Sequence, residues 1–341
     1  MAELPADSGD ARAWRRWVVT FAASFFGLIA LLLAAIILID PYDAGYFPSI
    51  IGPGAVDNNE YTNHASRARD PRFDAAIFGN SHGQLLNPTV LSKATGLALV
   101  QLYARGTGPA DQMHMMNFFL HHHPRARGIV LVADTFWCTH DAALPPPVDI
   151  PFPAWLYSND RVVYLAHMLN VRMTKRMYLR VMMALGRVEA ANPDGFSDYE
   201  SGKAWSFQPT VPADAGATQA SSGPIRPDTS FPAIDRFDRM ISTMPAETAV
   251  AIVMPPVFHT YLPAPGSAAA ADLRACKDLL TRSAGRRPNG AFLDFMTDSE
   301  ISREPRNFMD VDHMRSNVAH VIESRLAAAL AAPARPVGTS P

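Results

Sequence analysis

The feature that most constrains this chain is an uninterrupted apolar segment near its N-terminus. Residues 17–39 run from Trp17 to Ile39, 23 positions without a charged side chain, and are rich in Leu, Ile, Ala and Phe. As a helix that rises about 1.5 Å per residue, the segment is roughly 35 Å long, enough to cross the hydrocarbon core of a bilayer with some tilt. The sequence therefore predicts one membrane-spanning helix.

Flanking charges predict how this helix is oriented. Arg12, Arg15 and Arg16 precede it and Asp40 follows it. The positive-inside rule places residues 1–16 in the cytoplasm and everything after Asp40 outside, which predicts a single-pass protein of the inner membrane with a periplasmic domain. A cleaved signal peptide is the alternative. The apolar run is long for one, and no small-x-small site follows it, so an uncleaved anchor is favoured.

Composition narrows the class of protein. Of the 341 residues, 48% are apolar and the formal net charge is −2, which supports a sizeable core and gives no indication of nucleic-acid binding. Cys138 and Cys276 are the two cysteines. An oxidising compartment would allow them to pair, but positions so far apart give no geometric support, so we expect two buried, unpaired thiols.

The rest of the chain reads as a connector followed by one large domain. Residues 40–72 are rich in Pro, Gly and Asn and predict a membrane-proximal connector packed on the domain, which spans 73–332. Residues 1–11 and 333–341 are expected to be disordered. Strands are predicted at 74–78, 98–103, 128–134, 249–254 and 290–295, and helices at 88–95, 110–122, 267–283 and 317–332. This alternation favours a parallel, doubly wound α/β sheet.

An insertion at 140–231 breaks the alternation. It contains a Met- and Arg-rich helical run at 161–188 and a loose segment at 209–230. We interpret it as a helical cap beside the site, with a flexible loop.

A serine lies on a tight turn directly after the first predicted strand. The turn, residues 79–83, reads Gly-Asn-Ser-His-Gly. In open α/β folds, a residue on such a strand-to-helix turn is exposed at the carboxyl edge of the sheet, where ligands bind. Ser81 is therefore a candidate nucleophile. A structural serine that caps the next helix is the alternative.

Near the other end of the domain, residues 310–313 read Asp-Val-Asp-His just before the last helix. Asp310 can share one turn with His313 and hold one ring nitrogen, which leaves the other nitrogen free to take a proton from a serine. Asp312 is a weaker rival, because a residue adjacent to the histidine usually points elsewhere. A helix-capping role for the pair is the alternative. With Ser81, the pair predicts a serine hydrolase or acyltransferase.

The two blocks, in this order and at these places, resemble the SGNH, or GDSL-type, hydrolase superfamily. Its first block is matched by Gly79-Asn80-Ser81-His82 and its last by Asp310-Val311-Asp312-His313. The resemblance covers about 74–330 without the insertion. It is closer to membrane-anchored envelope proteins related to alginate O-acetylation and to D-alanyl transfer onto teichoic acids than to secreted lipases.

This resemblance implies a three-layer, flavodoxin-like α/β domain in which Ser81 is the nucleophile, His313 the general base and then acid, and Asp310 the orienting carboxylate. It also implies an oxyanion hole built from the Ser81 N–H and a glycine after the second strand, either Gly106 or Gly108. The family's third donor is an asparagine after the third strand. It is missing here, because residues 133–136 read Ala-Asp-Thr-Phe.

Other residues are candidates for the oxyanion hole or for substrate contact. Thr135 and Asn80 are the candidates to replace the missing asparagine. His82 neighbours the serine, but a surface or capping histidine is about as plausible. Asp134 ends the third strand, where a structural turn residue is the alternative. His259 follows the fourth strand and faces the same edge.

No metal site or cofactor is expected. The consecutive histidines 121–123 cannot all face one ion from a helix, and no partner lies at ligand spacing. Gly106-Thr107-Gly108 lacks the third glycine of a dinucleotide fingerprint and follows the wrong strand.

The sequence thus predicts a membrane-anchored serine acyltransferase or esterase that acts on acyl, mainly acetyl, esters of an envelope glycan. The resemblance implies a multi-spanning membrane acyltransferase as partner. The main alternative is an inactive SGNH-like module that binds glycan or scaffolds an envelope complex. A free esterase on small or lipid esters is a third reading.

Overall fold

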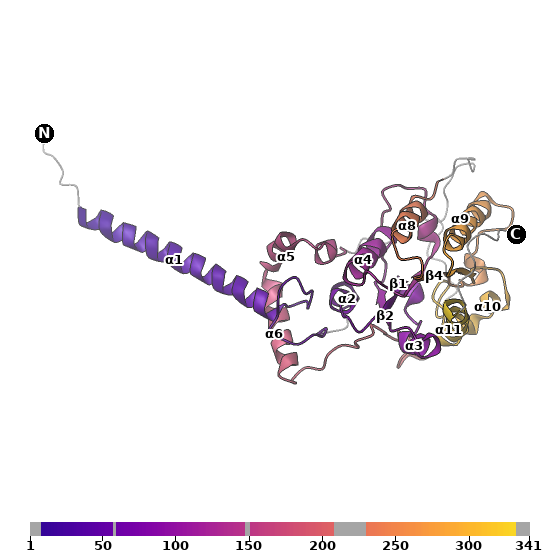
Figure 1. The fold of residues 1–341 in the computed structure, drawn as a ribbon, viewed down its shortest axis with the longest axis horizontal. Coiled ribbons are helices and arrows are strands. Elements are labelled where there is room, and N and C mark those ends of the chain that lie inside the picture. The colour runs from indigo at the N-terminus through magenta and orange to yellow at the C-terminus, as the bar shows by residue number, and fades with distance from the viewer. Residues whose placement is uncertain (1–7, 57–58, 147–150, 208–229, 332–341) are drawn as a thin grey trace.

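One long helix and one α/β domain make up the computed structural model, which describes residues 8–56, 59–146, 151–207 and 230–331. Helix α1 spans Ser8–Ile39 and projects away from the domain as a single rod (Figure 1). Its segment Ala11–Ile39 has a mean hydropathy of 2.8 and is long and apolar enough to cross a membrane. Residues 8–11 were predicted to be disordered but form the start of this helix, so that part of the prediction was wrong. The tails at 1–7 and 332–341 lie outside the described residues.

The domain is built on a five-stranded sheet in which all strands run parallel. The strands are β1 (Ala75–Gly79), β2 (Leu99–Tyr103), β3 (Gly128–Val132), β4 (Ala249–Met254) and β5 (Gly290–Asp294). Their order is β2-β1-β3-β4-β5, so the chain reverses its direction of progress across the sheet between β1 and β3. In such sheets, ligands bind outside the carboxyl ends of the strands at this switch point. The prediction of a parallel α/β sheet is confirmed.

Helices cover both faces of the sheet, which gives three layers. Alternate strand residues enter two separate cores: Ala76 and Phe78 face one side, Ala75 and Ile77 the other. The first face is covered by α2 (Glu60–Ala68), α4 (Pro109–His122), α8 (Pro232–Ser242) and α9 (Ala268–Gly285). The second is covered by α3 (Pro88–Thr95) and α11 (Ser316–Ala331).

Capping residues explain where two of these helices start. Asn87 caps α3 by accepting the N–H groups of Thr89 and Val90, and Pro88 occupies the first helical position, where its missing N–H costs nothing. Ser267 caps α9 by accepting the N–H of Ala270, as expected. Short segments complete the fold: the 3-10 turns η1 (Ser81–Gly83), η2 (Thr135–Cys138), η3 (Ala154–Tyr157), η4 (His259–Tyr261) and η5 (Pro305–Asn307), and the one-turn helix α10 (Glu300–Arg303).

The helical part of the insertion packs against the connector. Helices α5 (Arg161–Met168) and α6 (Val171–Ala184) lie beside the inner end of α1 (Figure 1). The buried Arg180 of α6 pairs with Asp43 at 2.9 Å, and Arg176 donates to the Thr62 hydroxyl at 2.6 Å. The insertion reaches the site instead through its later part, at Tyr199. Most of the expected flexible loop, 209–230, lies outside the described residues.

The two cysteines form a disulfide, so the prediction of unpaired thiols was wrong. Cys138 ends η2 after β3, and Cys276 lies in α9, with 5.5 Å between their Cα atoms. The two elements are 138 residues apart in sequence. They meet because α9 packs over η2 and β4, a contact that spacing along the chain does not reveal.

Candidate active site

Ser81 lies at the carboxyl edge of the sheet, on a turn whose two glycines, Gly79 and Gly83, pack closely against β3. A Cβ on Gly79 would lie 2.9 Å from Cβ of Val132 in β3, and one on Gly83 would lie 2.9 Å from Cγ2 of the same valine. Between the two glycines, Asn80 caps the turn by accepting the His82 N–H at 3.1 Å. The turn can therefore pack closely on β3 while Ser81, at its first position, stays accessible.

His313 is held by a compact loop between η5 and α11. An isolated bridge pairs Phe308 with Met314 and closes the loop. Inside it, Oδ1 of Asp310 accepts the backbone N–H groups of Asp312 at 3.1 Å and of His313 at 2.8 Å. A hydrogen bond of 2.8 Å from the Phe258 N–H to the Val311 carbonyl ties the loop to the chain after β4. These contacts fix the direction of the imidazole.

Ser81, His313 and Asp310 form one hydrogen-bonded chain. The distance from Ser81 Oγ to His313 Nε2 is 2.9 Å, and His313 Nδ1 lies 2.9 and 3.0 Å from the two carboxylate oxygens of Asp310. With Nδ1 protonated and donating to Asp310, Nε2 is left to accept the serine proton. The serine and the histidine are 232 residues apart, and the sheet brings them together.

A second carboxylate also reaches the imidazole. Asp312 Oδ1 lies 3.0 Å from His313 Nδ1, but it does not form the aligned hydrogen bond that Asp310 makes. Burial lowers the pKa of His313, but the hydrogen bonds to Asp310 and the contact with Asp312 outweigh that effect, and the pKa is raised. The imidazolium that would form during proton transfer is thus stabilised by two carboxylates.

His82 lies next to this chain and bridges two carboxylates. Its Nε2 is 3.4 Å from Asp312 Oδ2, and its Nδ1 is 3.3 Å from Asp134 Oδ2. Burial lowers the pKa of His82, but Asp134 and Asp312 together raise it to about 10. At neutral pH His82 is therefore a cation, and its ring centre lies 5.2 Å from that of His313.

The turns after β2 and β3 meet the serine turn through Asn80. The Asn80 amide donates to Oδ2 of the buried Asp134 and, at 3.4 Å, to the Thr107 carbonyl. Asp134 also caps η2 by accepting the Phe136 N–H at 2.9 Å. Asp134 is thus both a turn residue and part of the charged network around His82. The Asn80 side chain is fully engaged in holding the turns, which leaves its amide with no N–H aimed at substrate.

The remaining predicted residues fall into two groups. Gly106, whose φ of 65° favours glycine, and Gly108 flank Thr107 on the turn that Asn80 contacts, and Thr135 starts η2 beside Asp134. These residues share the carboxyl edge with Ser81. His259 starts η4 after β4, where its ring centre lies 4.6 Å from that of Phe258 and the two rings are tilted by 57°. Among the described residues, the structure records no contact between His259 and the Ser81–His313 pair.

Tyr199 is a site residue that the sequence analysis missed. Its ring meets the His313 ring edge-on, with 6.1 Å between centroids, and its hydroxyl donates to the Met314 carbonyl. Burial, with Glu200 and Asp310 nearby, raises its pKa, so it stays neutral. It belongs to the insertion and lies in no motif, so no sequence signal singled it out.

His82, Asp312 and His313 also form a group whose ligand atoms lie within 4.8 Å of one another, close enough to hold a metal ion. The same atoms already pair with one another as cation and carboxylate. In addition, a His313 whose Nδ1 donates to Asp310 would have to lose that proton before the same nitrogen could bind a metal. The geometry therefore fits the hydrogen-bonded triad better than a metal centre.

Relatives of known function would offer a separate line of support for this site. Comparison with protein-family models and with the sequences of curated proteins finds no match to this chain.

Proposed function

We propose that the protein is a membrane-anchored, extracytoplasmic serine acyltransferase or esterase of the SGNH type. The observation that carries this proposal is the hydrogen-bonded chain from Ser81 through His313 to Asp310 at the carboxyl edge of the sheet. A nucleophile, a base within reach of it and a group that orients the base are the parts that acyl transfer through serine requires.

The reaction begins when Ser81 Oγ attacks the carbonyl carbon of an acyl ester while its proton passes to His313 Nε2. Collapse of the tetrahedral intermediate expels the leaving alcohol, which takes that proton, and leaves an acyl-serine. His313 then accepts a proton from water or from an acceptor hydroxyl, which attacks the acyl-serine. The second tetrahedral intermediate expels Ser81 Oγ, which takes the proton back from His313, and the acid or the new ester is released. Asp310 holds the required tautomer throughout.

Developing charge on the carbonyl oxygen needs donors. The N–H groups of Ser81 and of Gly106 or Gly108 are the candidates, because these residues lie on turns that Asn80 joins. The family's third donor, an asparagine after the third strand, is missing here, and the buried Asp134 on that turn is a carboxylate that accepts hydrogen bonds. The His82 cation offsets that negative charge, and each donor in such a hole is worth about 10²–10³ in rate.

The cellular location that we propose for the domain favours a substrate in the cell envelope. Helix α1 is long and apolar enough for a membrane anchor, and the Cys138–Cys276 disulfide fits an oxidising compartment outside the cytoplasm. A domain tethered there meets acyl esters of envelope glycans. It can receive acyl groups from a multi-spanning membrane acyltransferase, the partner that the resemblance implies.

The test is to incubate the full-length protein, in detergent micelles, with an activated acetyl ester. We expect ester turnover, and an acetyl adduct detected by intact mass. Ser81→Ala should abolish the adduct and lower turnover on the order of 10³-fold or more. Ser242→Ala, at an exposed serine of α8, is the matched control and should behave as wild type.

An inactive binding module is the second candidate, and the absence of the family asparagine after β3 favours it. This alternative predicts no adduct in folded wild-type protein and unchanged glycan binding by Ser81→Ala. A free esterase would turn over soluble esters without an acceptor glycan, so added glycan would not raise its rate.

A further inference from the structure

Charge is distributed very unevenly over the helical insertion. Residues 161–188 contain six cationic side chains and no Asp or Glu, although the chain as a whole is nearly neutral. Both α5 and α6 lie within this stretch. A segment of this kind is suited to an anionic surface.

Large apolar side chains share the outer faces of the two helices with these cations. On α5 and just after it, Val162 and Leu169 are exposed; on α6 and just after it, Tyr178 and Leu185 are exposed, all between 51% and 75%. The exposed Arg161 directly precedes Val162, and the exposed Lys175 lies about one helical turn before Tyr178. Exposed apolar residues that cluster in this way mark a contact surface.

The opposite faces of the helices are anchored to the protein. On α5, Tyr164 is buried and its hydroxyl donates at 2.9 Å to Asp40, the residue that follows α1. Met168, the last residue of α5, is buried as well. On α6, the buried Arg180 pairs with Asp43, and Met173 is buried as well. The orientation of the exposed faces is therefore fixed by ion pairs and packing on the connector.

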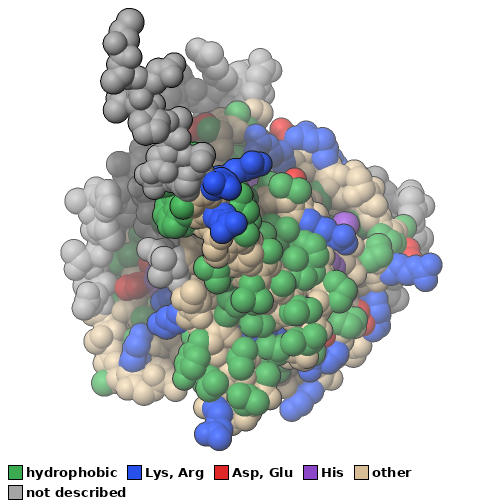
Figure 2. Space-filling view, turned by 90° about the vertical axis from the view of Figure 1, so that its left-hand side faces the viewer, with side chains coloured by type: hydrophobic (Ala, Val, Ile, Leu, Met, Phe, Trp, Pro, Cys, Tyr) green, Lys and Arg blue, Asp and Glu red, His purple; other side chains and the backbone are tan. Residues whose placement is uncertain are grey.

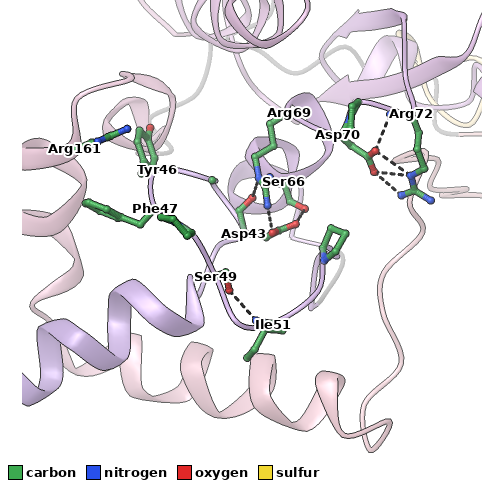
Figure 3. A pocket seen from close by; sticks show the side chains of 14 residues that line it. Asp43, Tyr46, Phe47, Ser49, Ile51, Ser66, Arg69, Asp70, Arg72 and Arg161 are labelled. Atoms are coloured by element: carbon green, nitrogen blue, oxygen red, sulfur yellow. Dashed lines mark hydrogen bonds and ion pairs between the residues drawn. The ribbon is translucent and has the colours of Figure 1, made fainter.

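These faces lie close to the C-terminal end of α1, where that helix joins the domain. Figure 1 shows α5 and α6 beside the point where α1 enters the domain. Figure 2, viewed from the side of α1 with that helix in front, shows hydrophobic side chains across the centre of this side and Lys and Arg side chains around them. A pocket of about 570 Å³ opens at the same place and is lined by Phe47, Ile51 and Arg161 (Figure 3). Arg161 thus belongs to both the pocket and the exposed face of α5.

We infer that the exposed faces of α5 and α6 rest on the surface of an anionic lipid bilayer around α1. Apolar side chains flanked by cations are the composition of helices that lie in the interface, with the apolar groups among the headgroups and the cations beside lipid phosphates. A membrane-spanning α1 holds these helices within reach of that surface. Such a contact would set the distance between the membrane and the carboxyl edge of the sheet. The inference does not depend on whether Ser81 is a nucleophile.

The test uses the full-length protein in nanodiscs, with one nitroxide label at a time. Because Cys138 and Cys276 are paired, a cysteine introduced by Val162→Cys, Tyr178→Cys or Leu185→Cys is labelled alone. Collision with oxygen, which enriches in lipid, is compared with collision with a water-soluble nickel chelate. Leu31→Cys on α1 is the lipid control, and Val321→Cys on α11, which is also exposed, is the water control.

In nanodiscs that contain anionic lipid, we expect labels at 162, 178 and 185 to favour oxygen severalfold over the value at 321. Values equal to that at 321 would overturn the proposal. Protection from both reagents would mean that a protein covers the face, and would also overturn it.

A charge arm tests the anionic component. The double variant Arg161→Glu/Lys175→Glu should lose the preference for oxygen at 178 in anionic nanodiscs. In this variant, the preference of the label at 178 for oxygen should then equal the preference measured in zwitterionic nanodiscs for a protein that keeps Arg161 and Lys175. If the preference is the same for both lipids and both charge states, the anionic requirement is wrong.

Discussion

Asp312 contacts both histidines of the site, and this makes the two carboxylates of the loop unequal in role. Asp310 makes the aligned hydrogen bonds to His313 Nδ1 and also accepts two backbone N–H groups, so it is held in place. Asp312 is shared between His313 and the His82 cation, which lower its pKa although burial raises it. Asp310 therefore orients the base, while Asp312 links it to His82.

This difference predicts unequal losses on substitution. Asp310→Asn should lower kcat by about 10³–10⁴-fold, because an amide cannot hold the required tautomer. Asp312→Asn leaves that hydrogen bond intact and should lower kcat far less. Turnover of the activated ester by the two purified variants checks this, and equal losses would contradict the assignment of Asp310.

His82 should set the pH at which the base works. His313 accepts a proton only when neutral, so activity rises with pH through its raised pKa. The His82 cation lowers that pKa, and with its own pKa of about 10 it stays charged over the neutral range. His82→Gln should therefore move the acid limb of kcat/KM to higher pH. His121→Gln, at an exposed histidine of α4, should leave the limb in place. A shift to lower pH in the first variant would show that residue 82 does not act as a cation.

At the scale of elements, the disulfide joins the turn after β3 to the helix layer. It links η2, whose N-cap is Asp134, to α9, one of the helices on the first face of the sheet. The backbone next to Asp134, a carboxylate that contacts His82, is therefore covalently tied to that helix. The cross-link closes a loop of 138 residues, and loops of that size lose much entropy in the unfolded chain when they are closed.

Removing the disulfide should therefore destabilise the domain. We expect Cys138→Ser/Cys276→Ser to lower the free energy of unfolding by about 2–5 kcal/mol. Reductant should lower the thermal midpoint of the wild type and leave that of the double variant unchanged, which calorimetry can measure. A wild-type midpoint that is insensitive to reductant, under conditions that free both thiols, would contradict this role.

At the scale of the whole molecule, the proposed topology places the site outside the cytoplasm. The anchor, the two amphipathic helices and the disulfide all agree with a domain that lies close to the outer face of the membrane. Residues 11 and 321 then lie on opposite sides of the bilayer.

Labelling with a membrane-impermeant maleimide tests this topology. In intact right-side-out spheroplasts, Val321→Cys should be labelled, whereas Ala11→Cys should be labelled only after lysis. The wild type, whose cysteines are paired, is the background control. Labelling of Ala11→Cys before lysis would reverse the proposed orientation.

Local pattern was enough to predict the five strands, the helices α3, α4, α9 and α11 and the α/β class, but it did not predict α2 or α8. The strands β1 to β4 are short apolar runs that are buried throughout, and α3 and α9 each begin at a recognisable cap, so composition over a few residues determines these elements. The apolar segment of α1 is determined in the same way. Ser81, Asp310 and His313 were also found locally, because their blocks lie on turns at the ends of predicted elements.

Only the tertiary structure decided which distant groups meet. The Cys138–Cys276 bond, the Tyr199 contact with His313 and the bridge from His82 to Asp312 each join residues more than 100 positions apart. The charge of His82 also depends on such contacts, because Asp134 and Asp312 raise its pKa against the effect of burial. The sequence by itself determined the elements, since each depends on its own side chains. The fold decided the pairings, because they depend on how the sheet and the insertion bring separate turns to one edge.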